Sequence, residues 1–99
     1  MAFPVIETVN ESSLNTAGTS HVVSLPTGIV AGNLLLIFID KGSTAATFNA
    51  LTGWTELLDE NLGNGIAILY RKADGTEGGT ITLTSSASTK SAHNSYRIS

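Results

Sequence analysis

The sequence predicts an all-β protein, an antiparallel β-sandwich or jelly-roll-like fold of six to eight strands with little or no helix. Short apolar or alternating runs recur along the chain, and residues typical of turns separate them. Thirteen Thr and eleven Ser make up almost a quarter of the 99 residues, and Thr favours strands. The alanine-containing stretch 43–51 has room for one helical turn, because its Thr and Asn residues disfavour a longer helix.

Three strands are predicted in the first half of the chain. Residues 3–9 are rich in β-branched side chains and end at the turn-like 10–13. Residues 21–25 form a second run, which Pro26-Thr27-Gly28 stops. Leu34–Ile39 is a continuous apolar run of six residues, and its length and flanking glycines favour a strand that is covered on both faces.

Four further strands are predicted, at residues 54–61, 66–72, 80–84 and 94–99. The first two flank Asn64-Gly65, and Asn-Gly supplies the positive φ angles that tight hairpins need. The third alternates strictly, with Ile81 and Leu83 expected to point inward. A polar loop at 85–91 is expected before the last strand.

The chain shows no internal repeat, linker or block of charge, so we expect one domain over residues 1–99. Tyr96 and Ile98 alternate with polar neighbours up to the last residue, so the sequence stops inside a predicted strand. Either this strand completes a sheet edge, or the 99 residues are the N-terminal part of a longer chain. We favour the second interpretation.

Composition excludes several functional classes. A chain without Cys holds no disulfide, thiolate metal site or Cys nucleophile. Five Lys and Arg at a net charge of −3 leave no basic surface for nucleic acid. The longest apolar run is too short to span a membrane, and Met1–Pro4 does not begin a signal peptide. We expect synthesis in a cytoplasm, no nucleic-acid partner and no membrane insertion.

No constellation in the sequence predicts catalysis, so we expect a non-enzymatic protein with no catalytic, cofactor-binding or metal-binding residues. His21 and His93 lack ligand partners at metal-binding spacing, and we interpret them as a hydrogen-bonded strand residue and an exposed loop residue. Asp59 and Glu60 are neighbours on a strand and would point to opposite faces, so they form no dyad. The stretch 74–79 lacks the ending of a phosphate loop and is interpreted as a structural turn rather than a cation site.

Several segments taken together resemble a known family. They are Leu25-Pro26, Val30–Leu36, Gly53–Leu57, Tyr70–Glu77, Thr80–Ser85 and Tyr96–Ile98. In this order they resemble a β-sandwich domain of tailed-bacteriophage virion proteins, of the capsid-decoration and tail-fibre or appendage type. The resemblance covers nearly the whole chain, and Gly32-Asn33 and Gly53-Trp54-Thr55 carry most of it. It implies a structural or binding role and no catalytic residues.

We therefore expect a phage virion structural protein, located in the virion after synthesis in the host bacterial cytoplasm. The expected partners are further copies of the same chain, in a homo-oligomer with three-fold symmetry favoured, and major capsid or tail proteins. Contacts would bury apolar patches and pair strand edges. The candidate edges are the N-terminal segment Phe3–Val9 and the C-terminal segment Tyr96–Ser99. The interface candidates in them are Phe3, Val5, Tyr96 and Ile98.

The alternative function is a carbohydrate- or receptor-binding β-sandwich module. Such a module needs exposed aromatic side chains on one face, and Trp54 is the candidate for stacking on a ligand, with Tyr70 and Tyr96 as the further aromatics. A glycan-cleaving enzyme is a third reading, and it would require two carboxylates facing each other across a cleft.

Overall fold

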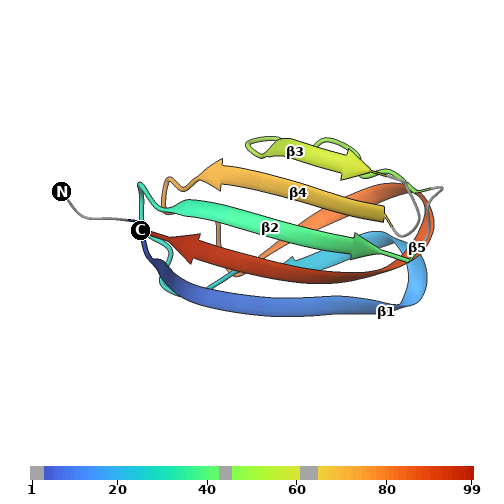
Figure 1. Cartoon of the computed structure of the whole chain (residues 1–99), viewed down its shortest axis with the longest axis horizontal. Helices are drawn as coiled ribbons and strands as arrows, with labels where there is room; N and C mark the ends of the chain where they lie inside the picture. Colours follow the sequence, from blue (N-terminus) through green and yellow to red (C-terminus); the bar gives the residue numbers. More distant parts are fainter. Residues whose placement is uncertain (1–3, 43–45, 61–64) are drawn as a thin grey trace.

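One antiparallel sheet of five strands accounts for the fold, and the all-β prediction is confirmed. The computed structural model describes residues 4–42, 46–60 and 65–99, and these contain no helix. The strands are β1 (Ile6–Ser24), β2 (Leu34–Lys41), β3 (Thr55–Glu60), β4 (Gly65–Lys72) and β5 (Thr80–Ile98). Their order across the sheet is β1-β5-β2-β4-β3 (Figure 1).

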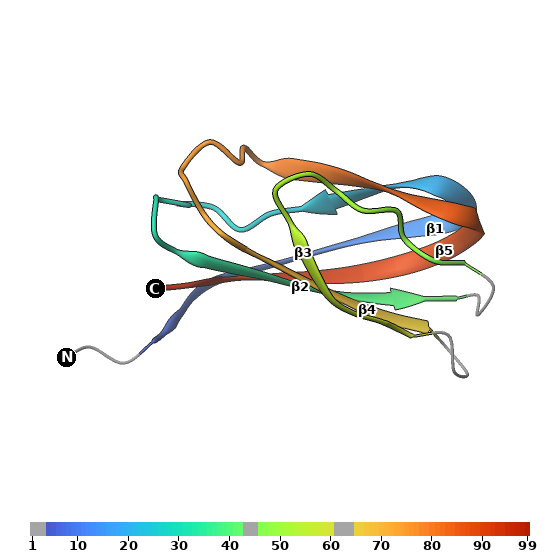
Figure 2. The same ribbon diagram turned by 90° about the horizontal axis from the view of Figure 1, so that it is seen from above.

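β1 and β5 are each 19 residues long, and each replaces two strands that the sequence predicts separately. Residues 6–14 pair with 91–98, and residues 20–24 pair with 80–84. Register shifts on either side of Gly18 mark the place where the two strands bend together. Figure 2 shows that the end of β1 and the start of β5 lie over the rest of the sheet. Because bends replace the expected loops, the described chain has five strands, and the count of six to eight is not confirmed.

The stretches 10–13 and 85–91, predicted as a turn and a loop, lie inside β1 and β5, so these two predictions are wrong. Their hydroxyl-rich composition is typical of loops, but Ser85, Thr89 and Ser91 are buried. Each of these hydroxyl groups has a hydrogen-bond partner in the fold. Strand structure is tolerated here because the buried polar groups are satisfied.

The apolar core lies between the central strands of the sheet and the bent ends of β1 and β5 (Figure 2). It consists of Val23, Leu25, Ile37, Ile39, Phe48, Ala67, Leu69 and Leu83. Phe48 comes from the connection between β2 and β3, which crosses to the start of β5. There the Asn49 N–H donates to the Thr84 carbonyl at 2.8 Å, which anchors this connection over the core.

The antiparallel pairing of β3 with β4 confirms the hairpin that Asn64-Gly65 predicts. The turn residues themselves, 61–64, lie outside the described residues. β3 contains a register shift between Glu56 and Leu58. This bulge changes which of its side chains face the core.

Candidate functional site

The side of the sheet that faces away from the core carries apolar side chains from all five strands, with the polar Asn94 among them. One row of paired residues crosses all five strands: Val9, Tyr96, Leu36, Tyr70 and Thr55. The next row is Glu11, Asn94, Phe38, Ile68 and Leu58. Directly opposed residues on neighbouring strands share one face of a sheet. We call the following set the outer apolar face: Val9, Leu34, Leu36, Phe38, Leu58, Ile66, Ile68, Tyr70, Tyr96 and Ile98.

The sequence of β2 explains why this face is apolar, because its residues are hydrophobic at odd and even positions alike. Leu35, Ile37 and Ile39 are buried in the core, whereas Leu34 and Phe38 on the other side are each 38% exposed. The prediction that Leu34–Ile39 is covered on both faces is therefore wrong for the chain by itself. Antiparallel sheets with one buried face normally carry polar residues on the other. This sheet does not follow that pattern.

The outer apolar face has an aromatic centre and charged residues at its margin. The rings of Phe38 and Tyr96 meet edge to face, with centroids 5.6 Å apart. Glu11, Asp40 and Lys72 occupy positions on the same side of the sheet, in register with or next to its apolar members. An apolar and aromatic centre with a polar rim is typical of protein–protein interfaces.

The sequence-predicted interface residues separate into three groups. Tyr96 and Ile98 are half-buried members of the outer apolar face. The expectation that the last strand forms a sheet edge is wrong, because β5 pairs with β1 on one side and β2 on the other. Val5 is 52% exposed, and its carbonyl accepts the Ser99 N–H at 2.9 Å. Phe3 lies outside the described residues.

Trp54, the predicted stacking residue, is half-buried and packs against the apolar core. It lines a cavity of about 240 Å³ together with Phe48 and Glu56. Tyr70 and Tyr96 lie instead on the outer apolar face, where both pair with Leu36. The structure therefore does not bring the three predicted aromatics together on one face.

A chain of buried hydrogen bonds runs through the interior near the bends of β1 and β5. Its members in order are Ser12, His93, Ser91, His21 and Ser85. Ser12 Oγ lies 2.8 Å from His93 Nδ1, and His93 Nε2 lies 2.7 Å from Ser91 Oγ. Ser91 Oγ lies 2.7 Å from His21 Nδ1, and His21 Nε2 lies 2.9 Å from Ser85 Oγ. His21 is thus the hydrogen-bonded strand residue that the sequence predicts. The prediction for His93 is wrong, since it is buried in β5.

The Ser85 end of this hydrogen-bond network sets the direction of the hydrogen bonds in it. The Ser85 hydroxyl donates to the Ala87 carbonyl at 2.8 Å, so Ser85 Oγ accepts the proton on His21 Nε2. At the other end Ser12 Oγ accepts the Ser24 N–H at 3.0 Å. Lowered pKa values favour neutral imidazoles, and two neutral rings then carry the proton on Nε2, so that every hydrogen bond in the network runs in the same direction.

Protonating either ring would place a second donor against an oxygen that already accepts a hydrogen bond. Burial lowers the pKa of His21. Burial and the nearby His21 lower the pKa of His93 to about 4. Both rings are enclosed by protein, so this network is a structural element and offers a substrate no access.

The loop after β4 holds its two acidic side chains in internal contacts. Arg71 donates from Nε to Glu77 Oε2 at 2.7 Å and from Nη2 to Asp74 Oδ2 at 2.9 Å. Glu77 also accepts the backbone N–H groups of Asp74 and Gly75, and Asp74 accepts that of Thr76. Hydrogen bonds from Thr76 lower the pKa of Asp74. These contacts support the interpretation of 74–79 as a structural turn.

One buried ion pair was missed by the sequence analysis. It joins Lys41 at the end of β2 to Asp59 in β3, and the two side chains are 0% and 7% exposed. The sequence does contain a signal that Lys41 points inward, because it continues the alternation of the inward residues Leu35, Ile37 and Ile39. A Lys in an inward register needs a buried acidic partner.

Comparisons with protein-family models, curated proteins and solved structures find no match for this chain. Over residues 4–42, 46–60 and 65–99, no three His, Asp or Glu side chains gather closely enough to hold a metal ion. In the same ranges no helix is long and apolar enough to cross a membrane.

Proposed function

We propose that this chain is a non-enzymatic structural domain of a tailed-bacteriophage virion, from a capsid decoration or a tail-fibre appendage. It acts by packing against further copies of itself and against major capsid or tail proteins. The observation that supports this proposal is the outer apolar face, which nothing in the described residues covers. Monomeric proteins rarely expose contiguous apolar patches beyond about 300–600 Å².

The proposal includes a finer description of the fold as a β-sandwich. One layer would hold β2, β3, β4 and the halves of β1 and β5 that carry the termini, and the second layer the remaining halves of β1 and β5 with residues 47–49. The hydrogen bonds of Thr47 and Asn49 to the start of β5 support this description. The outer apolar face is then free to meet a second sheet face, as stacked sheets do at about 10 Å separation.

The oligomeric state tests the proposed function. Light scattering after size exclusion should show a concentration-dependent homo-oligomer, with a trimer favoured, and the protein should co-sediment with assembled phage particles. Phe38→Asp should shift the population to monomer, because a carboxylate would be buried at the centre of the contact. Val22→Asp is the matched control, since Val22 is 51% exposed on the bent end of β1 and lies outside this face. The proposal is contradicted if the wild-type protein stays monomeric at all concentrations and does not co-sediment with phage particles.

A carbohydrate- or receptor-binding module is the second candidate, and the aromatic residues of the outer apolar face favour it. Phe38, Tyr70 and Tyr96 share that face and offer rings for stacking on sugars. Glycan-array binding that Tyr96→Ala abolishes would support this candidate. If Trp54→Ala abolishes glycan binding and Tyr96→Ala does not, the ligand site lies at Trp54 instead.

A further inference from the structure

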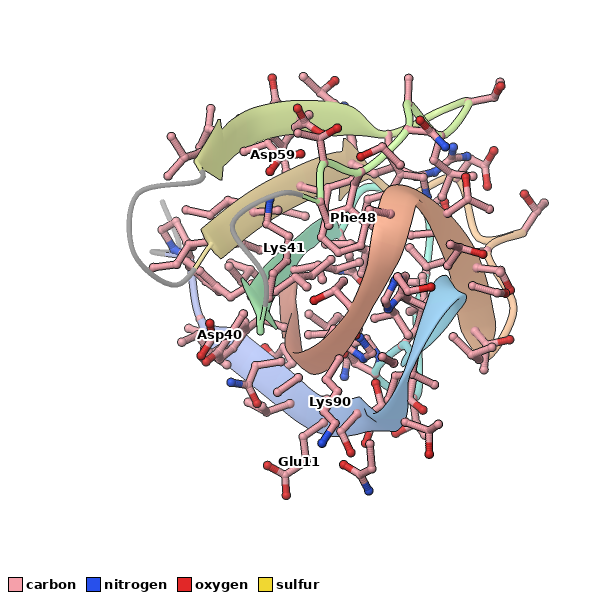
Figure 3. All side chains as sticks on the ribbon, turned by 90° about the vertical axis from the view of Figure 1, so that its right-hand side faces the viewer. Glu11, Asp40, Lys41, Phe48, Asp59 and Lys90 are labelled. Carbon is pink, nitrogen blue, oxygen red and sulfur yellow. The ribbon has the colours of Figure 1, made fainter. Side chains whose placement is uncertain are left out.

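The buried pair of Lys41 and Asp59 has the arrangement of two reactants held for condensation. Lys41 Nζ contacts Asp59 Oδ1 and also donates to the Ala46 carbonyl at 2.9 Å. Asp59 Oδ2 accepts the Phe48 N–H at 2.9 Å, which polarises the carboxyl group from its other oxygen. The ammonium group lies 5.4 Å from the centre of the Phe48 ring. Figure 3 shows Lys41 pointing toward Asp59 with Phe48 beside it.

Small residues in β4 allow this contact between two strands that are not neighbours. β4 separates β2 from β3, so the Lys41 side chain must cross it on the core side. Lys41 pairs with Gly65, and Asp59 pairs with Ala67. Gly65 has no side chain and Ala67 has a single methyl group, so the path across β4 stays open.

We propose that the ε-amino group of Lys41 and the carboxyl group of Asp59 condense into an intramolecular amide that joins β2 to β3 across β4. Burying two charges costs desolvation free energy, and a neutral amide in the same place does not have this cost. Well-oriented reactants reach effective concentrations of about 10⁵–10⁸ M, and the enclosed site expels the water that would reverse the reaction. Folding therefore provides both the proximity and the dry environment.

The reaction balances without an oxidant or a co-reactant. A proton passes from the ammonium group to the carboxylate, and the neutral Nζ attacks Asp59 Cγ. The tetrahedral intermediate loses a second proton from Nζ and expels one carboxyl oxygen as water. The Cγ–Nζ bond forms, one Cγ–O bond breaks, and the products are one amide and one water molecule.

Glu56 is placed to assist the proton transfers. It pairs with Leu69 and Asp59 pairs with Ala67, and both partners are buried residues of the core side. The bulge between Glu56 and Leu58 brings these two acids, three residues apart, to the same side of β3. Burial and the charge of Asp59 raise the pKa of Glu56, while the charge of Lys41 acts in the opposite direction. Glu56 is an exposed residue of the edge strand, and its raised pKa makes it hold a proton more readily than a glutamate without these neighbours.

Trypsin digestion of the denatured wild-type protein tests the proposal directly. Lys41 is the first basic residue in the sequence, so an unlinked chain yields residues 1–41 and 42–71 as separate peptides. The amide removes the cleavage site at Lys41 and joins both parts in one product that lacks the mass of one water molecule. Recovery of the two separate peptides at full mass overturns the proposal. Loss of water with cleavage after Lys41 retained also overturns it, because that pattern is a cyclic imide at an acidic residue.

Variants identify the atoms that react. Asp59→Asn should give a linked product of the same mass as the linked wild type, because its condensation releases ammonia in place of water. Asp59→Ala should restore cleavage after Lys41. Glu56→Gln should lower the linked fraction measured at early times after refolding. Asp40→Asn, on the opposite side of β2 from Lys41, is the matched control and should link as the wild type does.

Discussion

Lowering the pH from about 7.5 to about 5 should destabilise the protein through His93. Burial and the neighbouring His21 lower the pKa of His93 from its ordinary value of 6.5 to about 4 in the folded chain. The unfolded chain therefore binds a proton below pH 6.5, while the folded chain leaves His93 neutral until about pH 4. The contribution to stability is complete above pH 6.5 and is lost as the pH falls.

The expected size of this effect follows from the two pKa values. A tenfold difference in proton affinity corresponds to about 1.4 kcal/mol, so the change from 6.5 to about 4 amounts to about 3 kcal/mol. About 2 kcal/mol of this is lost between pH 7.5 and pH 5, where folded His93 is neutral and unfolded His93 becomes charged. His21 acts in the same direction, because burial lowers its pKa as well.

Urea unfolding at a series of pH values, followed by the fluorescence of Trp54, measures the free energy of unfolding. The variant His93→Gln keeps an amide donor and acceptor but does not titrate, so its stability should be lower at pH 7.5 and should vary less with pH. Subtracting the two profiles removes the contribution of the carboxylates that both proteins share. Equal pH slopes for wild type and variant, or a wild-type stability that does not fall toward pH 5, would refute the reasoning.

Two further predictions concern packing and backbone conformation. Ile37→Ala should lower the free energy of unfolding by about 2–5 kcal/mol, because Ile37 is fully buried, while Val22→Ala on an exposed position should change it by less than about 1 kcal/mol in urea unfolding. Gly32→Ala should cost about 1–2 kcal/mol, since Gly32 has a φ of 96° and open space around its Cα. Gly53→Ala should cost more than Gly32→Ala in the same assay, because Gly53 has a φ of 88° and an added Cβ would overlap Arg71 Nη1. Equal losses for the two glycine variants would show that Arg71 moves aside.

Local sequence patterns were sufficient for the strands whose partners are close in the chain. The apolar runs of β2 and β4 and the Asn64-Gly65 signal predict strands and a hairpin that the structure contains. The continuation of β1 through residues 10–20 and of β5 through residues 85–93 escaped prediction, because buried Ser residues there are satisfied by distant groups. Ser12 and His93, for example, are hydrogen-bonded at 2.8 Å although 81 positions separate them. No local pattern reports such a partner.

The candidate site was predicted only in part for a similar reason. The apolar side chains at even positions of β2 are visible in the sequence, but whether the fold covers them depends on the whole topology. Tyr96 was predicted as an interface residue at a sheet edge, and the structure places it in the middle of the sheet. The approach of Lys41 to Asp59 depends on Gly65 and on the bulge in β3, and neither is a signal that periodicity carries.

The pairing of the two chain ends has a mechanical consequence. Ile6 pairs with Ile98, the Ser99 N–H donates to the Val5 carbonyl at 2.9 Å, and the start of β1 and the end of β5 lie side by side at one end of the long axis (Figure 1). A force that pulls these ends apart would break the hydrogen bonds between β1 and β5 one after another, starting from the pair at the chain ends. Strands loaded in shear, by contrast, must break many hydrogen bonds at once. The domain should therefore yield at lower force when stretched through these two ends than when the same two strands are loaded in shear along their length.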